Sequence, residues 1–173
     1  MTERGWEPPL TIVPPGGGRS GLLGPGLGVL FKIPGEATGG ALSIVEHTFT
    51  VGTLVPPHVH TREDEYSVVL EGQIGFRSGA REVVLGAGGY ITKPRGELHA
   101  MWNAGQTPAR MIEVISPAGF ERFFGAIVDE LETATPDRDA LAGLPDAYGL
   151  SFGEPDWLQE IVARYGLNWP PPA

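Results

Sequence analysis

The sequence predicts an all-β protein that ends in a few α-helices. Its 26 glycines and 17 prolines, among 173 residues, separate short apolar runs. Several runs between residues 27 and 116 alternate apolar with polar side chains, as Ile74 and Phe76 do against Gln73 and Arg77. Regularly spaced short strands joined by turns indicate a sandwich or a barrel. The chain length fits one domain.

The expected elements follow one another in three segments. Residues 1–26 form a Gly/Pro-rich arm with one short strand at Leu10–Val13, residues 27–116 form the β-domain, and residues 117–173 form a helical extension packed on it. Within the β-domain the runs that read as strands are LGVLFKI, ALSIVEHTFTV, EYSVVL, QIGFR, REVVL, YITK, LHAMWN and ARMIEVIS.

Apolar side chains recur at helical spacing after Ser116. Ser116 is the expected N-cap and Pro117 the first turn of a helix whose apolar stripe contains several phenylalanines. Further helices are expected to begin near Pro136 and at Pro155, the last one ending at Gly166. The first stripe could cover either the outer face of a sheet or the mouth of the barrel. We expect the outer face, because amphipathic helices usually pack in that way.

Charge and composition exclude several classes of partner. The formal net charge of −9 argues against nucleic acid and anionic membrane surfaces. No cysteine is present, which excludes disulfides and thiolate metal ligands. No apolar stretch approaches a membrane span, and the N-terminal residues lack the pattern of a signal peptide, so a cytoplasmic location is expected.

The run PPHVHTREDEYSVVLEG contains two of the four histidines. In a strand, His58 and His60 would point to the same side with Cα atoms about 6.6 Å apart, so their imidazoles could converge on one ion. The Pro56–Pro57 pair marks a strand entry or a bulge. A hairpin-like return would bring Glu65 beside both histidines.

His99 lies in a second run, downstream of a Pro94–Gly96 turn. Three imidazoles and one carboxylate suit a divalent transition metal such as Fe, Mn, Ni, Cu or Zn better than Ca or Mg. The alternative is a solvent-facing HxH pair without a ligand. His47 is expected at the surface or the edge of the core, and Trp102, of opposite parity to His99, should pack on the other face.

Two spaced motifs carry a resemblance to a known family. They read Gly52-x5-His58-x-His60-x4-Glu65-x6-Gly72 and Gly88-x5-Pro94-x-Gly96-x2-His99-x3-Asn103. Both resemble the signature motifs of the cupin superfamily, and the likeness extends over residues 42–116. The resemblance implies a double-sheet jelly-roll barrel that holds one metal ion through His58, His60, Glu65 and His99. The whole chain is similar to small single-domain bacterial proteins of the quercetinase-like type.

The resemblance implies a metal-dependent dioxygenase that acts on a small enolic or phenolic compound. Glu65 would be catalytic and accept a proton from the substrate, and dioxygen would be the second reactant. Pocket walls are expected from residues that share parity with the ligands: Ser67, Val69, Phe76 and Met101. The alternatives are a redox-neutral lyase, decarboxylase or isomerase, and a metal-containing protein that binds small molecules without turnover.

Exposed sheet edges and the dimers common among related cupins favour a homodimer.

Overall fold

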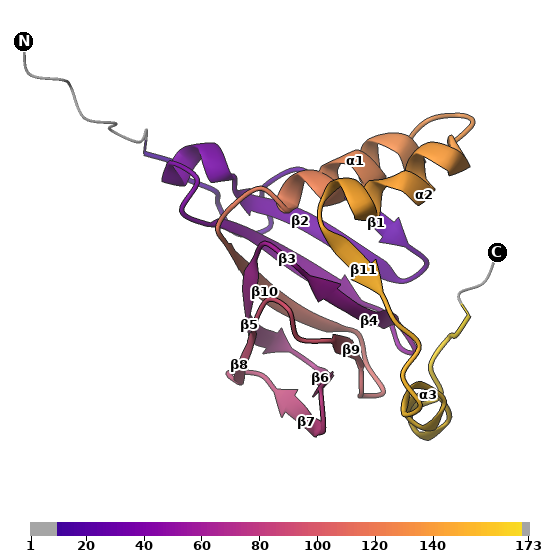
Figure 1. Cartoon of the computed structure of the whole chain (residues 1–173). Helices are drawn as coiled ribbons and strands as arrows, with labels where there is room; N and C mark the ends of the chain where they lie inside the picture. Colours follow the sequence, from indigo (N-terminus) through magenta and orange to yellow (C-terminus); the bar gives the residue numbers. More distant parts are fainter. Residues whose placement is uncertain (1–9, 171–173) are drawn as a thin grey trace, which may run out of the picture.

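Two antiparallel sheets face each other and enclose the core (Figure 1). The computed structural model describes residues 10–170. The six-stranded sheet has the order β1 (Ser20–Gly24), β2 (Leu27–Ile33), β3 (Ser43–Phe49), β10 (Ala109–Ser116), β5 (Asp64–Glu71) and β8 (Tyr90–Lys93). The five-stranded sheet has the order β11 (Leu150–Phe152), β4 (Leu54–His60), β9 (His99–Asn103), β6 (Gln73–Ser78) and β7 (Arg81–Gly86). This arrangement confirms the all-β jelly-roll prediction.

The alternation of side chains along the strands explains why the sheets face each other. In β3 every second residue is buried, from Ser43 through Val45 and His47 to Phe49, while Ile44 and the other intervening residues are more exposed. β10 alternates in the same way. Because successive side chains of a strand point to opposite faces, these patterns give each sheet one inner and one outer face.

The N-terminal segment differs in part from its prediction. The expected strand at Leu10–Val13 is wrong, because these residues have no regular secondary structure. β1 lies inside the segment that we expected to be an irregular arm, and it pairs with β2 through a turn at Pro25–Gly26. The sheet therefore begins at Ser20. Residues 1–9 of the predicted arm lie outside the described residues.

Three α-helices follow the last long strand: α1 (Glu121–Leu131), α2 (Arg138–Ala147) and α3 (Leu158–Tyr165). The predicted start of the first helix is wrong, because Ser116 ends strand β10 and its hydroxyl donates to the carbonyl of Ala41. α2 begins near the expected position, with the Asp137 carboxylate accepting from two backbone N–H groups of its first turn. α3 ends at Gly166, whose φ of 61° is left-handed, as predicted.

Helix α1 packs tightly against the six-stranded sheet. A Cβ at Gly21 of β1 would lie only 2.3 Å from a methyl group of Val128, so the glycine allows the helix to approach this closely. The start of the helix is fixed by Glu121, whose carboxylate accepts from the backbone N–H groups of Gly35 and Gly119. Gly35 begins a short 3-10 helix, Gly35–Thr38. α1 thereby becomes part of the core that contains Val29 of β2.

Helix α3 covers the outer face of the five-stranded sheet. Trp102 of β9 is fully buried there with Leu158 and Ile161 of α3, as the parity of Trp102 relative to His99 predicted. Gly75 on the neighbouring strand makes room for the indole, because a Cβ at Gly75 would lie 2.2 Å from it. None of the helices in residues 10–170 is long and apolar enough to cross a membrane.

Candidate metal centre and cavity

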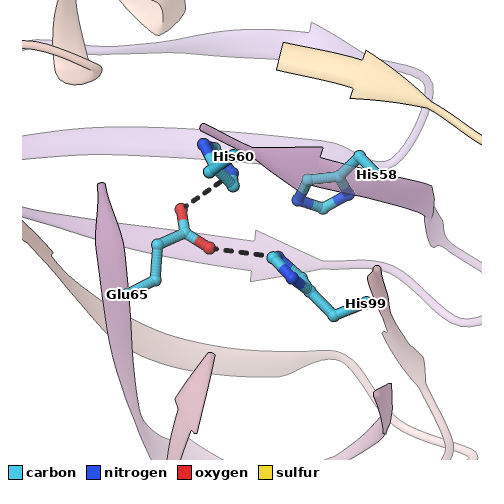
Figure 2. A group of neighbouring side chains, drawn as sticks. All are labelled: His58, His60, Glu65 and His99. Atoms are coloured by element: carbon cyan, nitrogen blue, oxygen red, sulfur yellow. Dashed lines mark ion pairs between the residues drawn. The ribbon is translucent and has the colours of Figure 1, made fainter. Parts of the chain in front are cut away.

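Three histidines and one glutamate meet between the two sheets (Figure 2). His58 and His60 lie on β4, Glu65 at the start of β5, and His99 at the start of β9. All four side chains are buried, and one potential ligand atom from each lies within 4.8 Å of the others. The structure thus brings together the four residues that the sequence predicted as metal ligands.

The backbone places these residues by a bulge and a change of sheet. The register between β4 and β9 shifts between Val55 and His58, at the proline pair, and His58 then faces His99 directly. Glu65 reaches the site differently from our expectation of a hairpin-like return. β4 and β5 belong to different sheets, so Glu65 faces the histidines across the interior of the barrel.

Backbone carbonyls fix the tautomers of two of the histidines. Nδ1 of His58 lies 2.7 Å from the carbonyl oxygen of Pro56, and Nδ1 of His99 lies 3.0 Å from that of Glu97. A carbonyl oxygen can only accept, so each Nδ1 carries the hydrogen. In the neutral rings Nε2 therefore presents a lone pair, which is the state that ligates a metal ion.

The electrostatics of the cluster fit a cation. Burial lowers the pKa of His60 to about 4. Burial also lowers the pKa of His58 well below its ordinary value, and the neighbouring rings of His99 and His60 lower it further. Both rings are therefore neutral at pH 7. Oε1 of Glu65 lies 3.4 Å from Nε2 of His60, and Oε2 of Glu65 lies 3.4 Å from Nε2 of His99. Nε2 of His99 is buried without a hydrogen-bond partner. A divalent transition-metal ion among these nitrogen and oxygen donors would satisfy them all.

A buried lysine supports Glu65 from behind. Nζ of Lys93 lies 2.9 Å from Glu65 and 2.7 Å from Glu113, which also accepts from the hydroxyl of Ser67. Burial opposes ionisation of Glu65, but the ammonium of Lys93, followed by His60, outweighs burial and holds the pKa of Glu65 well below its ordinary value. Burial raises the pKa of Glu113 to about 7. Glu65 is therefore ionised, as a metal ligand must be.

Sequence reasoning missed Lys93. A signal was available, because in the run YITK the lysine shares parity with Ile91, and an unpaired lysine is rarely buried. In the structure Lys93 pairs directly with Glu65 in the β5–β8 ladder.

A cavity of about 240 Å³ opens onto the cluster. His58, His60 and Glu65 form part of its lining, and the remaining residues are mainly apolar: Leu23, Leu27, His47, Val55, Pro56, Met101, Phe120, Phe123, Phe124, Ile127, Leu150 and Phe152. Four of these residues belong to α1 or directly precede it. The ring of Phe120 meets that of His60 edge to face, with centroids 4.3 Å apart.

The expected position of α1 on the outer face of a sheet is therefore wrong. The apolar stripe of the helix forms a wall of the cavity beside the cluster, whereas α3 packs on an outer face. An amphipathic pattern identifies which side of a helix is buried but not which apolar surface it meets. Here the covered surface is the opening between the sheets.

Of the four predicted pocket residues, only Met101 lines the cavity. Val69 and Phe76 belong to a packed core cluster with Met111, and Ser67 is engaged with Glu113. All of them are buried, as their parity predicted. Parity determines the face of a sheet but not which strand borders the cavity: Phe76 pairs directly with Met101, but its strand β6 lies one strand farther from β4.

His47 is not at the surface. Its side chain is buried, lines the cavity and lies outside the four-residue cluster. The prediction that it is not one of the cluster's ligands agrees with this placement, and of the two expected positions, the surface and the edge of the core, the surface is wrong.

Comparison with known proteins agrees with this architecture. Residues 45–115 match the cupin domain family. These residues therefore resemble a cupin domain. Among solved structures, an RmlC-like cupin from Shewanella frigidimarina aligns with a TM-score of 0.53 at 24% identity, over 61% of this chain and 88% of that one. This likeness shows the shared fold.

Curated relatives match about half of the chain. A germin-like protein, subfamily T member 2, of Arabidopsis thaliana is 39% identical over 88 residues, which are 48% of this chain and 40% of the relative. The tetracenomycin polyketide synthase protein TcmJ of Streptomyces glaucescens is 35% identical over 81 residues, which are 47% of this chain and 53% of the relative. The chain spans about half the length of these relatives or less.

Proposed function

We propose that this protein is a metal-dependent dioxygenase of the quercetinase-like type that acts on a small enolic or phenolic compound. One observation carries the proposal: the donor cluster opens into an apolar cavity with aromatic walls. The cavity is slightly smaller than the 300–1,000 Å³ typical of sites for drug-sized ligands, which favours a compact ligand of one or two rings.

The lining favours a phenol or an enol over a strongly anionic substrate. Among the described residues that line the cavity there is no lysine or arginine, so a phosphate or a second carboxylate would find no countercharge. A ring, in contrast, can lie against Phe120 and Phe124, and its hydroxyl can reach the cluster. A relative named for a polyketide synthase is compatible with such a substrate.

His58, His60, Glu65 and His99 would hold one ion such as Fe, Mn, Ni, Cu or Zn. When bound, this ion would supply Lewis acidity and an open coordination position, and a redox-active metal would also supply electrons to dioxygen.

The protein's own residues contribute a base and a dry environment. Oε2 of Glu65 faces Lys93, so Oε1, which lies 3.4 Å from Nε2 of His60 on the cluster side, would be the oxygen that accepts the hydroxyl proton of the substrate. Phe120, Phe123 and Phe124 exclude water and orient the ring. Removal of the proton leaves an electron-rich oxyanion, which is the form that reacts with dioxygen.

Oxygen uptake tests the proposal. The purified protein is loaded with one metal at a time and offered a panel of phenols and enols. We expect a substrate to disappear with equimolar oxygen uptake, both atoms of ¹⁸O₂ in the products, and no uptake by Glu65→Gln or by the Zn-loaded protein. Substrate loss without oxygen uptake would show a redox-neutral lyase, decarboxylase or isomerase. Ligand-induced thermal stabilisation without any product would show a binding protein.

We also propose a homodimer in the cytoplasm. β1 and β8 are edge strands of the six-stranded sheet, and Leu22 of β1 and Tyr90 of β8 are exposed hydrophobic residues. Light scattering that gives the mass of one chain would reject the dimer. Fractionation of the source cells would test the location.

A further inference from the structure

The chain's fourth histidine, which the metal cluster does not use, also lines the cavity. His47 is 2% exposed and lines the cavity together with His58, His60 and Glu65. It lies on β3, two strands away from β5 in the six-stranded sheet, so on the order of 10 Å separates its strand from that of Glu65. The polar lining of an otherwise apolar cavity therefore has two separate parts, the metal cluster and His47.

The hydrogen bond to Gly28 defines the chemistry of this ring. Nδ1 of His47 lies 3.1 Å from the carbonyl oxygen of Gly28, which can only accept, so Nδ1 carries the hydrogen. Burial lowers the pKa of His47 to about 4, and the ring is neutral at pH 7. Nε2 consequently presents a lone pair and can only accept a hydrogen bond.

The surroundings of His47 leave this acceptor without a partner. The ring packs edge to face against Phe124, at 5.1 Å between centroids, and against Phe49, at 6.4 Å. Within residues 10–170 no hydrogen bond reaches its Nε2. In an otherwise apolar cavity such an acceptor is satisfied only by a ligand or by water, whereas a packing role needs no acceptor at all.

We propose that Nε2 of His47 accepts a hydrogen bond from a hydroxyl of the substrate and selects ligands with two oxygen functions. One oxygen would meet the metal cluster, and a second hydroxyl, at the far side of a flat one- or two-ring compound, would meet His47. The substrate class is then a polyhydroxylated aromatic or enolic compound. This inference rests on the proposed phenolic or enolic substrate but not on the use of dioxygen.

A matched pair of probes tests the role of His47. 2,7-Dihydroxynaphthalene and 2-naphthol differ by one hydroxyl, and their affinities are measured by calorimetry on the Zn-loaded protein, which cannot turn over by redox chemistry. For the natural sequence we expect the dihydroxy probe to bind roughly threefold to tenfold more tightly, as one additional hydrogen bond implies. In His47→Phe, which keeps a ring but removes the acceptor, the ratio should fall to about one.

Two further variants keep the test decisive. His47→Asn can still donate to Gly28 but has no acceptor at the position of Nε2, so it should also lose the preference, and it replaces His47→Phe if that variant does not fold. Phe124→Leu alters the apolar wall and should weaken both probes alike. Metal content and circular dichroism verify that each variant is folded and loaded.

Each contrary outcome identifies what has failed. An unchanged ratio in both His47 variants would overturn the role of His47. Failure of both probes to bind would overturn the phenolic ligand class on which the inference rests. Absence of oxygen uptake with the phenol and enol panel would reject the dioxygenase reaction. That result is independent of the affinity ratio of the two probes, so it would leave the role of His47 standing.

Discussion

Lys93 and Glu65 form a buried ion pair directly behind the candidate metal centre, with 2.9 Å between Nζ and Oε2. The same ammonium lies 2.7 Å from Glu113, so one positive charge serves two buried carboxylates. The three side chains come from adjacent strands: β8, β5 and β10. The orientation of Glu65 therefore depends on a charged residue that lies outside the predicted ligand set.

Replacement of Lys93 by methionine should destabilise the protein by about 3–5 kcal/mol, because it leaves buried carboxylates without a countercharge. The double variant Lys93→Met with Glu113→Gln restores part of the charge balance and should recover part of that loss. Urea denaturation of the metal-free protein measures both variants. Equal losses in the single and the double variant would contradict the shared-charge arrangement.

Metal content tests the ligand assignment. His60→Ala and His99→Ala should each retain much less than one divalent ion per chain, because each loses a donor of the cluster. His47→Asn provides the matched control, since it removes a buried histidine of the same cavity without removing a cluster donor, and it should retain the metal. Elemental analysis of dialysed protein measures all three. Stoichiometric metal in a His58/His60 double variant would contradict the assignment.

The two apolar helices should respond differently to truncation of a side chain. Phe120→Ala at the start of α1 should reduce stability by about 3–5 kcal/mol and also weaken the binding of 2-naphthol, because Phe120 contacts His60 at the cavity. Leu158→Ala on α3 should reduce stability by about 2–5 kcal/mol and leave that binding unchanged, because α3 packs on the outer face with Trp102. Thermal melting and calorimetry measure the two effects. Unaltered ligand affinity in Phe120→Ala would show that α1 has a purely structural role.

Stability of the metal-free protein should fall as the pH is lowered from about 6.5 to about 4. The pKa of His47 is about 4 in the folded chain, mainly because of burial, and 6.5 in the unfolded chain. The unfolded chain therefore binds more protons in this window, and acid favours unfolding by on the order of 3 kcal/mol through His47 alone. His60 acts in the same direction.

Glu113 acts in the opposite direction. Its raised pKa stabilises the folded form at low pH, and this contribution is lost as the pH rises from 4.5 through about 7. His47→Asn isolates the contribution of the histidine, and its stability should change less between pH 6.5 and 4 than that of the natural sequence. Urea denaturation in chelator at several pH values measures the difference. Identical pH profiles would contradict the buried, neutral state of His47.

Local alternation was sufficient to predict much of the site. The two-residue alternation of side chains along a strand predicted that His58 and His60 share one face and that Trp102 lies on the face opposite to that of His99. Turn residues marked the ends of most strands. The position of α1 could not be predicted, because an apolar stripe does not specify its partner surface. The burial of His47 could not be read from parity alone, because the proline pair interrupts the alternation between it and His58. β11 has only three residues and depends on pairing with β4, which no local pattern reveals.

The claim that the metal centre and the apolar cavity form one site is tested most directly by the visible absorption spectrum of the Co(II)-loaded protein during titration with 2-naphthol. We predict a saturable change in the d–d bands with one ligand per metal, and no such change in His60→Ala. Saturable binding of 2-naphthol, seen by calorimetry, with an unchanged cobalt spectrum would show that ligand and metal occupy separate sites and would contradict the account.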